Sequence, residues 1–309
     1  MKKNFPPSDF EQAICGVSAF FAVCGRPLRI EDVRRYMVFP GSEKKNLSDE
    51  EIGDFFNGNL KFGQLNGCFF PTGQEYLASN FENKEQVTNR YWKKVFKFGP
   101  LLQMVPFIRA IAVCNTLSFN NCNENSDIDL FIIVKKGRIF TARIFSVLLT
   151  YLLGVRRHGD KVAGRFCLSF YVADDGMNLE KMVLNNDAYL YYWMRALRFI
   201  YCRNGFDQSD FFESNKWFKD SYVDYSESAK KDDFLSFLRF FPEFILGGFI
   251  GNWLENRLGK MHFSRFRKNR KSFGTQADVV VSKSMLKFHN IDRRRQYNED
   301  FFRLYEALL

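Results

Sequence analysis

The 309-residue sequence predicts an α+β protein in three parts: a winged-helix-like module, a mixed-sheet core and a helical C-terminal region. Helix signals followed by a hairpin signal define the module, residues 1–92. Alternating strand and helix patterns define the core, residues 93–177, and helical spacing of apolar residues dominates residues 178–309. A hydrophobic content of 46% with 26% charged residues is typical of a globular protein and excludes a disordered or collagen-like chain.

Three short helices are expected in the first part. Asp9 precedes a run from Phe10 to Val23 whose apolar residues recur at helical spacing, so Asp9 is expected to cap this helix. A second helix is predicted from Ile30 to Met37. Ser48, followed three residues later by Glu51, has the spacing of a capping box and predicts the start of the third helix.

An Asn-Gly pair at residues 66 and 67 predicts a β-hairpin after these helices. Three helices followed by a hairpin is the order of a winged helix. DNA binding is one interpretation of the role of such a module. The charges argue against that role, because residues 1–95 carry 13 basic and 12 acidic side chains and the third helix is acidic. A packing or protein-contact role is therefore favoured for this module.

The core is predicted from five segments. A helix from Lys84 to Phe98 leads to a buried strand from Phe107 to Cys114. After a polar turn, a second strand runs from Ile128 to Val134. A helix from Arg138 to Gly154 and a third strand from Arg165 to Ala173 follow. The order of strand, loop, strand, helix and strand indicates a mixed α/β core.

The composition narrows the class of protein further. Phe accounts for 37 of the 309 residues, so aromatic-rich cores are expected. The seven cysteines include no C-x-x-C pair and no secretory signal is visible, which favours reduced, mostly buried thiols in a cytoplasmic protein. A net charge of +10 favours anionic partners such as nucleotides or nucleic acid.

Two apolar stretches, from Ile139 to Val155 and from Phe240 to Leu254, are shorter than the roughly 20 residues that a membrane span needs. Basic residues flank the first stretch, and Glu243 lies near the centre of the second. Both are therefore interpreted as buried core helices, and no membrane partner is expected.

The segment with the clearest chemistry is Asp127-Ile128-Asp129, which leads into an apolar strand. Side chains alternate along a strand, so Asp127 and Asp129 share one face and lie close together. Adjacent carboxylates repel each other without a cation, and hard oxygen ligands suit Mg²⁺, which also binds triphosphate oxygens. The sequence therefore predicts a magnesium site at Asp127 and Asp129.

A phosphate-binding turn is expected upstream of the acidic pair. Asn115 and Thr116 end a strand at a polar turn, where free backbone N–H groups and hydroxyls can hold a phosphate. Ser118 and Ser126 lie in the same loop. We therefore expect Asn115, Thr116, Ser118 and Ser126 to bind the phosphate of a ligand such as a nucleotide.

This pattern resembles the nucleotidyltransferase superfamily, the fold shared by DNA polymerase beta and aminoglycoside nucleotidyltransferases. The family signature is Gly-Ser, a short spacer and Asp-x-Asp; here it reads Asn115-Thr116, ten residues, then Asp127-Ile128-Asp129. The match covers residues 105–175. The flanks look like uncharacterised bacterial nucleotidyltransferase-domain proteins in four places: Arg26-Pro27-Leu28 and residues 165–170, 215–217 and 286–294.

The resemblance implies a transferase that moves an NMP from an NTP, such as ATP, to a hydroxyl acceptor and releases pyrophosphate. It implies that Asp127 and Asp129 carry the catalysis and hold two Mg²⁺ ions. A small molecule, an RNA end and a protein side chain all remain open as acceptors. The alternative is a degenerate member that binds nucleotide or nucleic acid as a scaffold or regulator. The basic stretch 257–271 allows a nucleic-acid partner, but a solvated helix face is favoured.

Two features depart from the family pattern. Asn115 replaces the family's glycine, and Asn is the next most tolerant residue for left-handed backbone. Well-studied members place a third carboxylate on a later strand, but the segment from Phe166 to Val172 contains no Asp or Glu. Asp174 or Asp175, just beyond that strand, are the local substitutes, although a turn before Gly176 is the simpler explanation for them.

Overall fold

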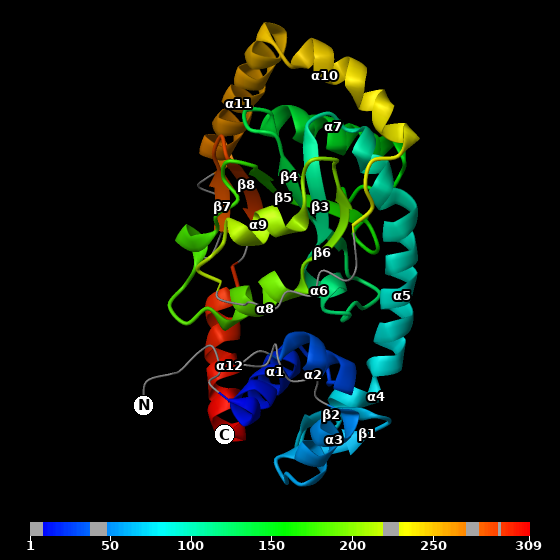
Figure 1. The fold of residues 1–309 in the computed structure, drawn as a ribbon, viewed down its shortest axis with the longest axis vertical. Coiled ribbons are helices and arrows are strands. Elements are labelled where there is room, and N and C mark those ends of the chain that lie inside the picture. Colours follow the sequence, from blue (N-terminus) through cyan, green and yellow to red (C-terminus); the bar gives the residue numbers. More distant parts are fainter. Residues whose placement is uncertain (1–8, 38–47, 219–228, 270–277, 290–291) are drawn as a thin grey trace.

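The computed structural model describes residues 9–37, 48–218, 229–269, 278–289 and 292–309 (Figure 1). Within these ranges the chain forms a six-stranded mixed sheet, a separate two-stranded hairpin and many helices, so the α+β class is confirmed. The helices are α1 (Phe10–Val23), α2 (Ile30–Tyr36), α3 (Asp49–Asn57), α4 (Tyr76–Ser79), α5 (Phe81–Phe98), η2 (Gly99–Met104), α6 (Asn115–Ser118), α7 (Ile139–Leu152), η3 (Glu180–Met182), α8 (Ala188–Ala196), α9 (Gln208–Glu213), η4 (Phe234–Arg239), α10 (Phe240–Leu246), α11 (Phe249–Asn269) and α12 (Arg294–Leu308). The strands are β1 (Phe62–Leu65), β2 (Cys68–Pro71), β3 (Ile108–Val113), β4 (Ile128–Val134), β5 (Phe166–Ala173), β6 (Arg198–Cys202), β7 (Asp278–Val281) and β8 (Met285–His289).

The six strands of the large sheet lie in the order β6-β3-β4-β5-β8-β7. β4 and β5 run parallel, and the other neighbouring pairs are antiparallel. Because β4 and β5 are parallel, the chain crosses through α7 from the end of one strand to the start of the next. The three strands and the crossover helix expected in the core are confirmed, with ends that differ by one or two residues.

The expectation of a mostly helical C-terminal region is wrong for three segments. β6 adds to β3 at one edge of the sheet, and β8 with β7 adds to β5 at the other. Runs of four or five residues show no periodicity that separates a strand from a turn of helix, which explains the error. The sheet thus draws strands from both sides of residue 177, and the division into domains at residues 92 and 177 stays a prediction.

Alternate residues of β4 enter two separate hydrophobic cores. Ile128, Leu130 and Ile132 pack into a core that includes residues of α5 and α7, and α11 packs against it. Phe131 and Ile133 pack into a second core, shared with α1, α8 and α12. The first three residues therefore point away from the acidic pair, as expected, and Asp129 lies on the face of β4 that α8 covers.

The N-terminal part contains the expected three helices and hairpin in order. Asp9 caps α1, and Ser48 and Glu51 form the capping box of α3. Asn66 and Gly67, at φ values of +52° and +72°, supply the left-handed backbone of the hairpin turn. α1 packs against α12, so helices from distant parts of the chain are neighbours (Figure 1).

The surface of α3 is anionic, because Asp49, Glu50 and Asp54 are all exposed on it. Such a helix repels phosphate, which favours a packing role over DNA binding for this module. The winged-helix assignment itself stays a prediction.

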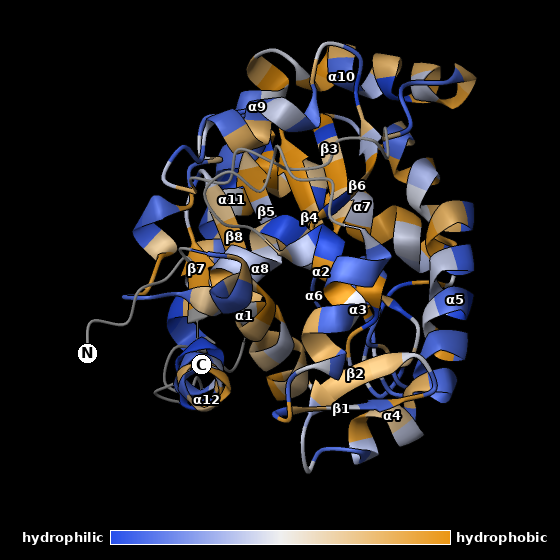
Figure 2. Ribbon diagram, turned by 60° about the horizontal axis from the view of Figure 1, so that its bottom comes forward, coloured by the Kyte–Doolittle hydropathy of each residue, from blue (hydrophilic) through white to orange (hydrophobic). Residues whose placement is uncertain are grey.

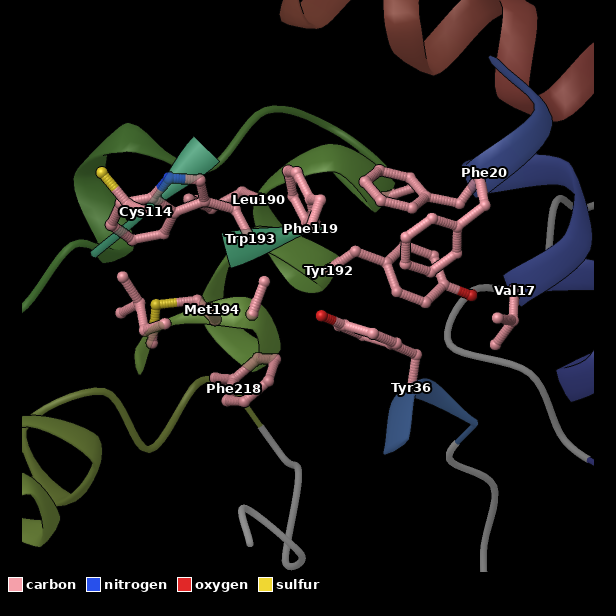
Figure 3. Packing of buried hydrophobic residues seen from close by; sticks show 14 of the residues in the cluster. Val17, Phe20, Tyr36, Cys114, Phe119, Leu190, Tyr192, Trp193, Met194 and Phe218 are labelled. Atoms are coloured by element: carbon pink, nitrogen blue, oxygen red, sulfur yellow. The ribbon is translucent and has the colours of Figure 1, made fainter. Parts of the chain in front are cut away.

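Aromatic side chains join the N-terminal helices to the sheet (Figure 3). Phe20 of α1 stacks on Tyr192 of α8 with ring centroids 4.4 Å apart, and it meets Phe119, just after α6, at 5.3 Å. Trp193 packs against Phe131 of β4 at 5.6 Å. The expected aromatic-rich core is confirmed, and it holds the turn after β3 between α1 and α8.

Only the first of the two apolar stretches lies in the core. α7 buries Ile139 and Ala142, while Leu148 and Leu152 near its end are 51% and 72% exposed. The second stretch, Phe240 to Leu254, is mostly exposed, and α10 contains no buried residue. The expectation of a buried core helix is therefore wrong there, because apolar composition does not reveal which face a helix turns inward.

None of the helices in the described ranges is by itself long and apolar enough to cross a membrane. Phe234–Leu246 and Phe249–Lys268 reach the required length and apolar content only as a pair, and the pair bends by 89° at its break.

Candidate active site

Asp127 and Asp129 lie at the start of β4, on the face expected from the sequence. Asp127 directly precedes the strand and Asp129 is its second residue, and both are half-buried. One carboxylate oxygen of each lies within 4.8 Å of the other and of the Cys167 sulfur. The two carboxylates therefore converge on a volume that a metal ion can fill.

The third member of this group is a thiol, which the sequence analysis did not single out. Cys167 is the second residue of β5 and is paired in register with Asp129 across the parallel strands. Among the residues that the structure describes, Asp127, Asp129 and Cys167 are the one group of three His, Cys, Asp or Glu side chains placed to hold a metal ion. Burial, together with the two neighbouring carboxylates, raises the pKa of the Cys167 thiol.

Asn115 ties the upstream turn to the acidic pair. Its φ is +57°, so Asn115 adopts the left-handed backbone that the sequence analysis expected it to tolerate. Its amide nitrogen donates to Asp129 Oδ2 at 2.9 Å, and its amide oxygen accepts from Trp193 Nε1 at 2.8 Å. Both ends of the amide are thus occupied, and Asp129 is held in one orientation.

Burial raises the pKa of Asp129 to about 6, and the negative charge of Asp127 adds to the effect. The hydrogen bond from Asn115 acts in the opposite direction and favours the carboxylate. A cation between the two carboxylates would remove the repulsion, because it supplies positive charge where burial has withdrawn water. The two carboxylates therefore fit a hard divalent cation, whereas the thiol does not.

Arg157 already supplies one positive charge at this place. Its Nη1 lies 2.6 Å from Asp127 Oδ2 and 3.8 Å from the Cys167 sulfur. Sequence analysis missed Arg157, although a signal existed. A parallel crossover from β4 through α7 brings the residues just before β5 back beside the start of β4, which is where Asp127 lies.

A cleft of about 210 Å³ opens beside Asn115 on the same side of the sheet. It combines aromatic rings with basic side chains. Tyr189, Trp193 and Tyr297 supply the rings, and Lys287 and Arg293 supply two of the charges. The cleft thus offers apolar surface for a flat ring and positive charge for an anion, next to the acidic pair.

The cluster around Arg294 also lines this cleft. Arg294 donates to Asp292 at 2.8 Å and lies 3.4 Å from Asp187, and its Nη1 donates to the Met182 carbonyl oxygen at 2.8 Å. These contacts fix the start of α12 against the segment before α8. α12 therefore contributes a wall of the cleft.

Asp174 and Asp175 do not complete the acidic site. They follow β5, seven and eight residues beyond Cys167, so Asp174 lies about 23 Å along the strand from it. Asp174 instead receives a hydrogen bond from the Lys136 backbone at 2.9 Å and lies 3.3 Å from Arg109. Neither aspartate is therefore the third carboxylate, and both lie in the turn before Gly176 that the sequence analysis favoured for them.

The remaining expected nucleotide-binding residues lie near the acidic pair in sequence. Ser118 is buried, and its hydroxyl donates to the Asn115 carbonyl oxygen at 2.9 Å. Ser126 Oγ accepts from the Asn123 backbone at 3.0 Å. Thr116 is half-buried in α6. Both serine hydroxyls thus make local hydrogen bonds, and phosphate binding by these three residues stays a prediction.

We expect Asn115→Ala to lower the free energy of unfolding by about 2–4 kcal/mol, and Asn115→Gly to cost about 1 kcal/mol less. Both variants remove the bonds to Asp129 and Trp193, but only alanine also strains the left-handed backbone. Urea unfolding of the three proteins measures the difference. An alanine variant as stable as the glycine variant would contradict the backbone assignment.

No family model, no curated protein and no solved structure matches this chain. The class of this protein is therefore defined by its fold and by the chemistry of its site. It is a mixed α/β protein with two carboxylates and a thiol converging at one end of its only parallel strand pair within the described ranges.

Proposed function

We propose that this protein is a nucleotidyltransferase, which moves an NMP from an NTP to a hydroxyl acceptor with Mg²⁺ held by Asp127 and Asp129. The observation that carries the proposal is the convergence of these two carboxylates with the left-handed Asn115 turn, beside a cleft lined by aromatic and basic side chains. A hydroxyl acceptor fits because its attack on a phosphate depends mainly on positive charge and alignment. It does not require a nucleophilic side chain of the protein.

The proposed reaction forms a bond from the acceptor oxygen to the α-phosphorus and breaks the bond from that phosphorus to the bridging oxygen. Pyrophosphate leaves with that bridging oxygen, and the acceptor proton passes to solvent. Asp127 and Asp129 would hold the Mg²⁺, which would supply positive charge to the phosphates. Asn115 holds Asp129 in position, and Arg157 is the counter-ion of Asp127 that a metal ion must displace.

The cleft suits the rest of the nucleotide. Tyr189 and Tyr297 lie with ring centroids 5.3 Å apart and offer a surface on which a base can stack. Lys287 and Arg293 bring positive charge to the same cleft, where phosphate oxygens would bind. Asn115 belongs both to the cleft lining and to the acidic site, so it connects the two subsites.

A degenerate nucleotidyltransferase that binds nucleotide without turnover is the second candidate. Two observations favour it. The residue of β5 that lies beside Asp129 is a thiol and not a carboxylate, and Asp127 already forms an ion pair with Arg157. Mg²⁺ prefers oxygen ligands, so Cys167 adds little to its binding. The two candidates differ in turnover and share nucleotide binding.

Thermal unfolding in the presence of ATP, GTP, CTP and UTP, with and without Mg²⁺, tests nucleotide binding, because a ligand that binds only the folded state raises the melting temperature. We expect a Mg²⁺-dependent rise with at least one NTP in the wild type and none in the Asp127→Ala/Asp129→Ala variant. Asp174→Ala/Asp175→Ala removes the same charge at the far end of β5 and is expected to keep the response. A response that survives loss of Asp127 and Asp129, or no response at all, would overturn the proposed metal site.

Asp129→Asn is expected to stabilise the metal-free protein at neutral pH. The pKa of Asp129 is about 6 in the folded chain and about 4 in the unfolded chain, so ionisation disfavours the folded state as pH rises between these values. The gain from Asn is therefore about 3 kcal/mol at pH 7.5, about half of that at pH 5, and absent below pH 4. Urea unfolding in EDTA at two pH values measures it. An Asn variant less stable than the wild type at both would contradict the raised pKa.

A further inference from the structure

An apolar ridge covers the outer side of η4, α10 and the start of α11, remote in the chain from the acidic site. Figure 2 shows hydrophobic residues along α10 at the rim of the molecule. Three ridge side chains, Phe240, Phe244 and Phe249, are 72%, 77% and 85% exposed. The exposed members of the apolar ridge are Phe234, Phe237, Leu238, Phe240, Phe241, Phe244, Ile245, Phe249, Ile250 and Trp253. Single exposed apolar residues are ordinary, but ten within twenty residues mark an interaction surface.

The charged residues of the same segment face the protein. Between residues 234 and 256 the sequence contains three charges, Arg239, Glu243 and Glu255. Arg239 is buried and lies 2.7 Å from Asp232, and Glu243 lies 2.7 Å from Arg203. The usual arrangement, with apolar residues inside and charges outside, is therefore inverted in η4 and α10.

Glu255 fixes the start of α11 in the same way. Its carboxylate is buried and accepts hydrogen bonds from the backbone N–H groups of Phe140 and Thr141, both at 2.9 Å, at the start of α7. Gly259, one turn further along, lies so close to Phe140 that an added Cβ would be 3.0 Å from its ring. The ridge is thus held in place by buried polar contacts, and its exposure does not come from a loosely attached segment.

A cationic surface begins where the ridge ends. From residue 256 to residue 268 the sequence holds five basic residues and no acidic one. Arg257 lies over the ring of Trp253 at 5.7 Å, which joins the ridge to this surface. Lys260, Arg267 and Lys268 line a hollow further along α11 together with Ser264. This part of α11 is therefore basic and attracts anions.

We propose that the apolar ridge and the basic face of α11 dock the protein onto an anionic lipid bilayer surface, without spanning it. The 89° bend between the helices of the pair rules out a straight span, but it puts a corner with exposed apolar side chains, Phe244, Phe249 and Ile250, at the surface. Arg257 follows Phe249 by eight residues, about 12 Å along the helix. With the corner sunk about 5–10 Å into the boundary of headgroups and acyl chains, Arg257 lies at the depth of the lipid phosphates and Trp253 near its preferred interfacial level.

The distribution of charge on this surface favours a lipid bilayer over two other partners, a second copy of the chain and a single-stranded RNA. A second copy packed ridge to ridge around a two-fold axis brings two cationic α11 surfaces near each other, which costs energy. A single-stranded RNA site interleaves cations with stacking rings. The ridge instead carries no outward charge for twenty residues and mixes aliphatic with aromatic side chains, which matches the interior of a lipid layer.

Flotation of the full chain with phosphatidylcholine vesicles, with and without phosphatidylglycerol, tests the proposal. We expect binding to the anionic vesicles that Phe240→Ser/Phe244→Ser weakens by about 100-fold, since each buried ring is worth about tenfold in partitioning. Leu60→Ser/Tyr76→Ser removes two other exposed apolar side chains, 96% and 63% exposed, and is expected to bind like the wild type. Arg257→Glu/Lys260→Glu, which changes the two cations nearest the apolar ridge, is expected to weaken anionic binding about tenfold, unlike Lys93→Glu/Lys97→Glu on α5.

Fluorescence of the wild-type protein gives a readout that needs no ridge variant. Trp253 is 57% exposed, so docking is expected to shift its emission to the blue and to allow quenching by brominated lipid, and Trp253→Phe removes both changes. Absence of vesicle binding would overturn the proposal. So would a ridge variant that binds as well as the wild type, or a wild type whose ridge only mediates self-association or RNA binding.

Discussion

Asp32→Ala is expected to lower the free energy of unfolding by about 3–5 kcal/mol, because it leaves a buried guanidinium without its counter-ion. Arg26 is 3% exposed and meets both carboxylate oxygens of Asp32, at 2.9 and 2.8 Å. Its guanidinium lies over the rings of Phe21 and Phe81 at 4.8 and 5.0 Å, so water cannot take the place of the lost carboxylate. Urea unfolding measures the change.

An exposed pair close by provides the matched control. Arg34 and Asp49 form an ion pair whose side chains are 46% and 66% exposed, so Asp49→Ala is expected to cost at most about 1 kcal/mol. The double variant Arg26→Met/Asp32→Leu removes both buried charges and is expected to recover most of the loss. Equal losses for Asp32→Ala and Asp49→Ala would show that Arg26 finds water or another partner.

Asp127→Asn or Asp129→Asn is expected to lower the rate of NMP transfer by about 10³-fold or more, because each carboxylate holds the charge on which phosphoryl chemistry depends. Radiolabelled α-phosphate, followed from NTP to water or to the protein itself, measures transfer before an acceptor is known. Asp174→Asn, at the other end of β5, is expected to keep the wild-type rate. Nucleotide binding without transfer in the wild type would favour the degenerate scaffold over the enzyme.

The sequence predicted the parts of the core whose patterns are long enough to be unambiguous. β3, β4 and β5 are runs of six to eight residues that are apolar apart from Arg109, Asp129 and Ser169, and α7 spans four turns. Runs of this length and composition separate strands from helices. The placement of Asp127 and Asp129 followed from alternation along one strand. The left-handed Asn115 followed from the conformational tolerance of its side chain.

Features that depend on contacts between distant segments escaped the sequence analysis. β6 and β8 are recognisable only from the strands beside which they pair. Cys167 joins the acidic pair because of the register between β4 and β5, which no local pattern encodes. The outward face of α10 depends on buried partners of Arg239 and Glu243 that lie elsewhere in the chain.

The ion pair between Arg157 and Asp127 makes cation uptake at this site an exchange and not an addition. A monovalent ion that displaces the Arg157 guanidinium replaces one positive charge by another, so the net charge at the site does not change. A divalent ion gains one unit, and it gains it beside the half-buried Asp129, where charge is least screened. In the proposed metal site, the exchange with Arg157 therefore favours a divalent ion over sodium or potassium.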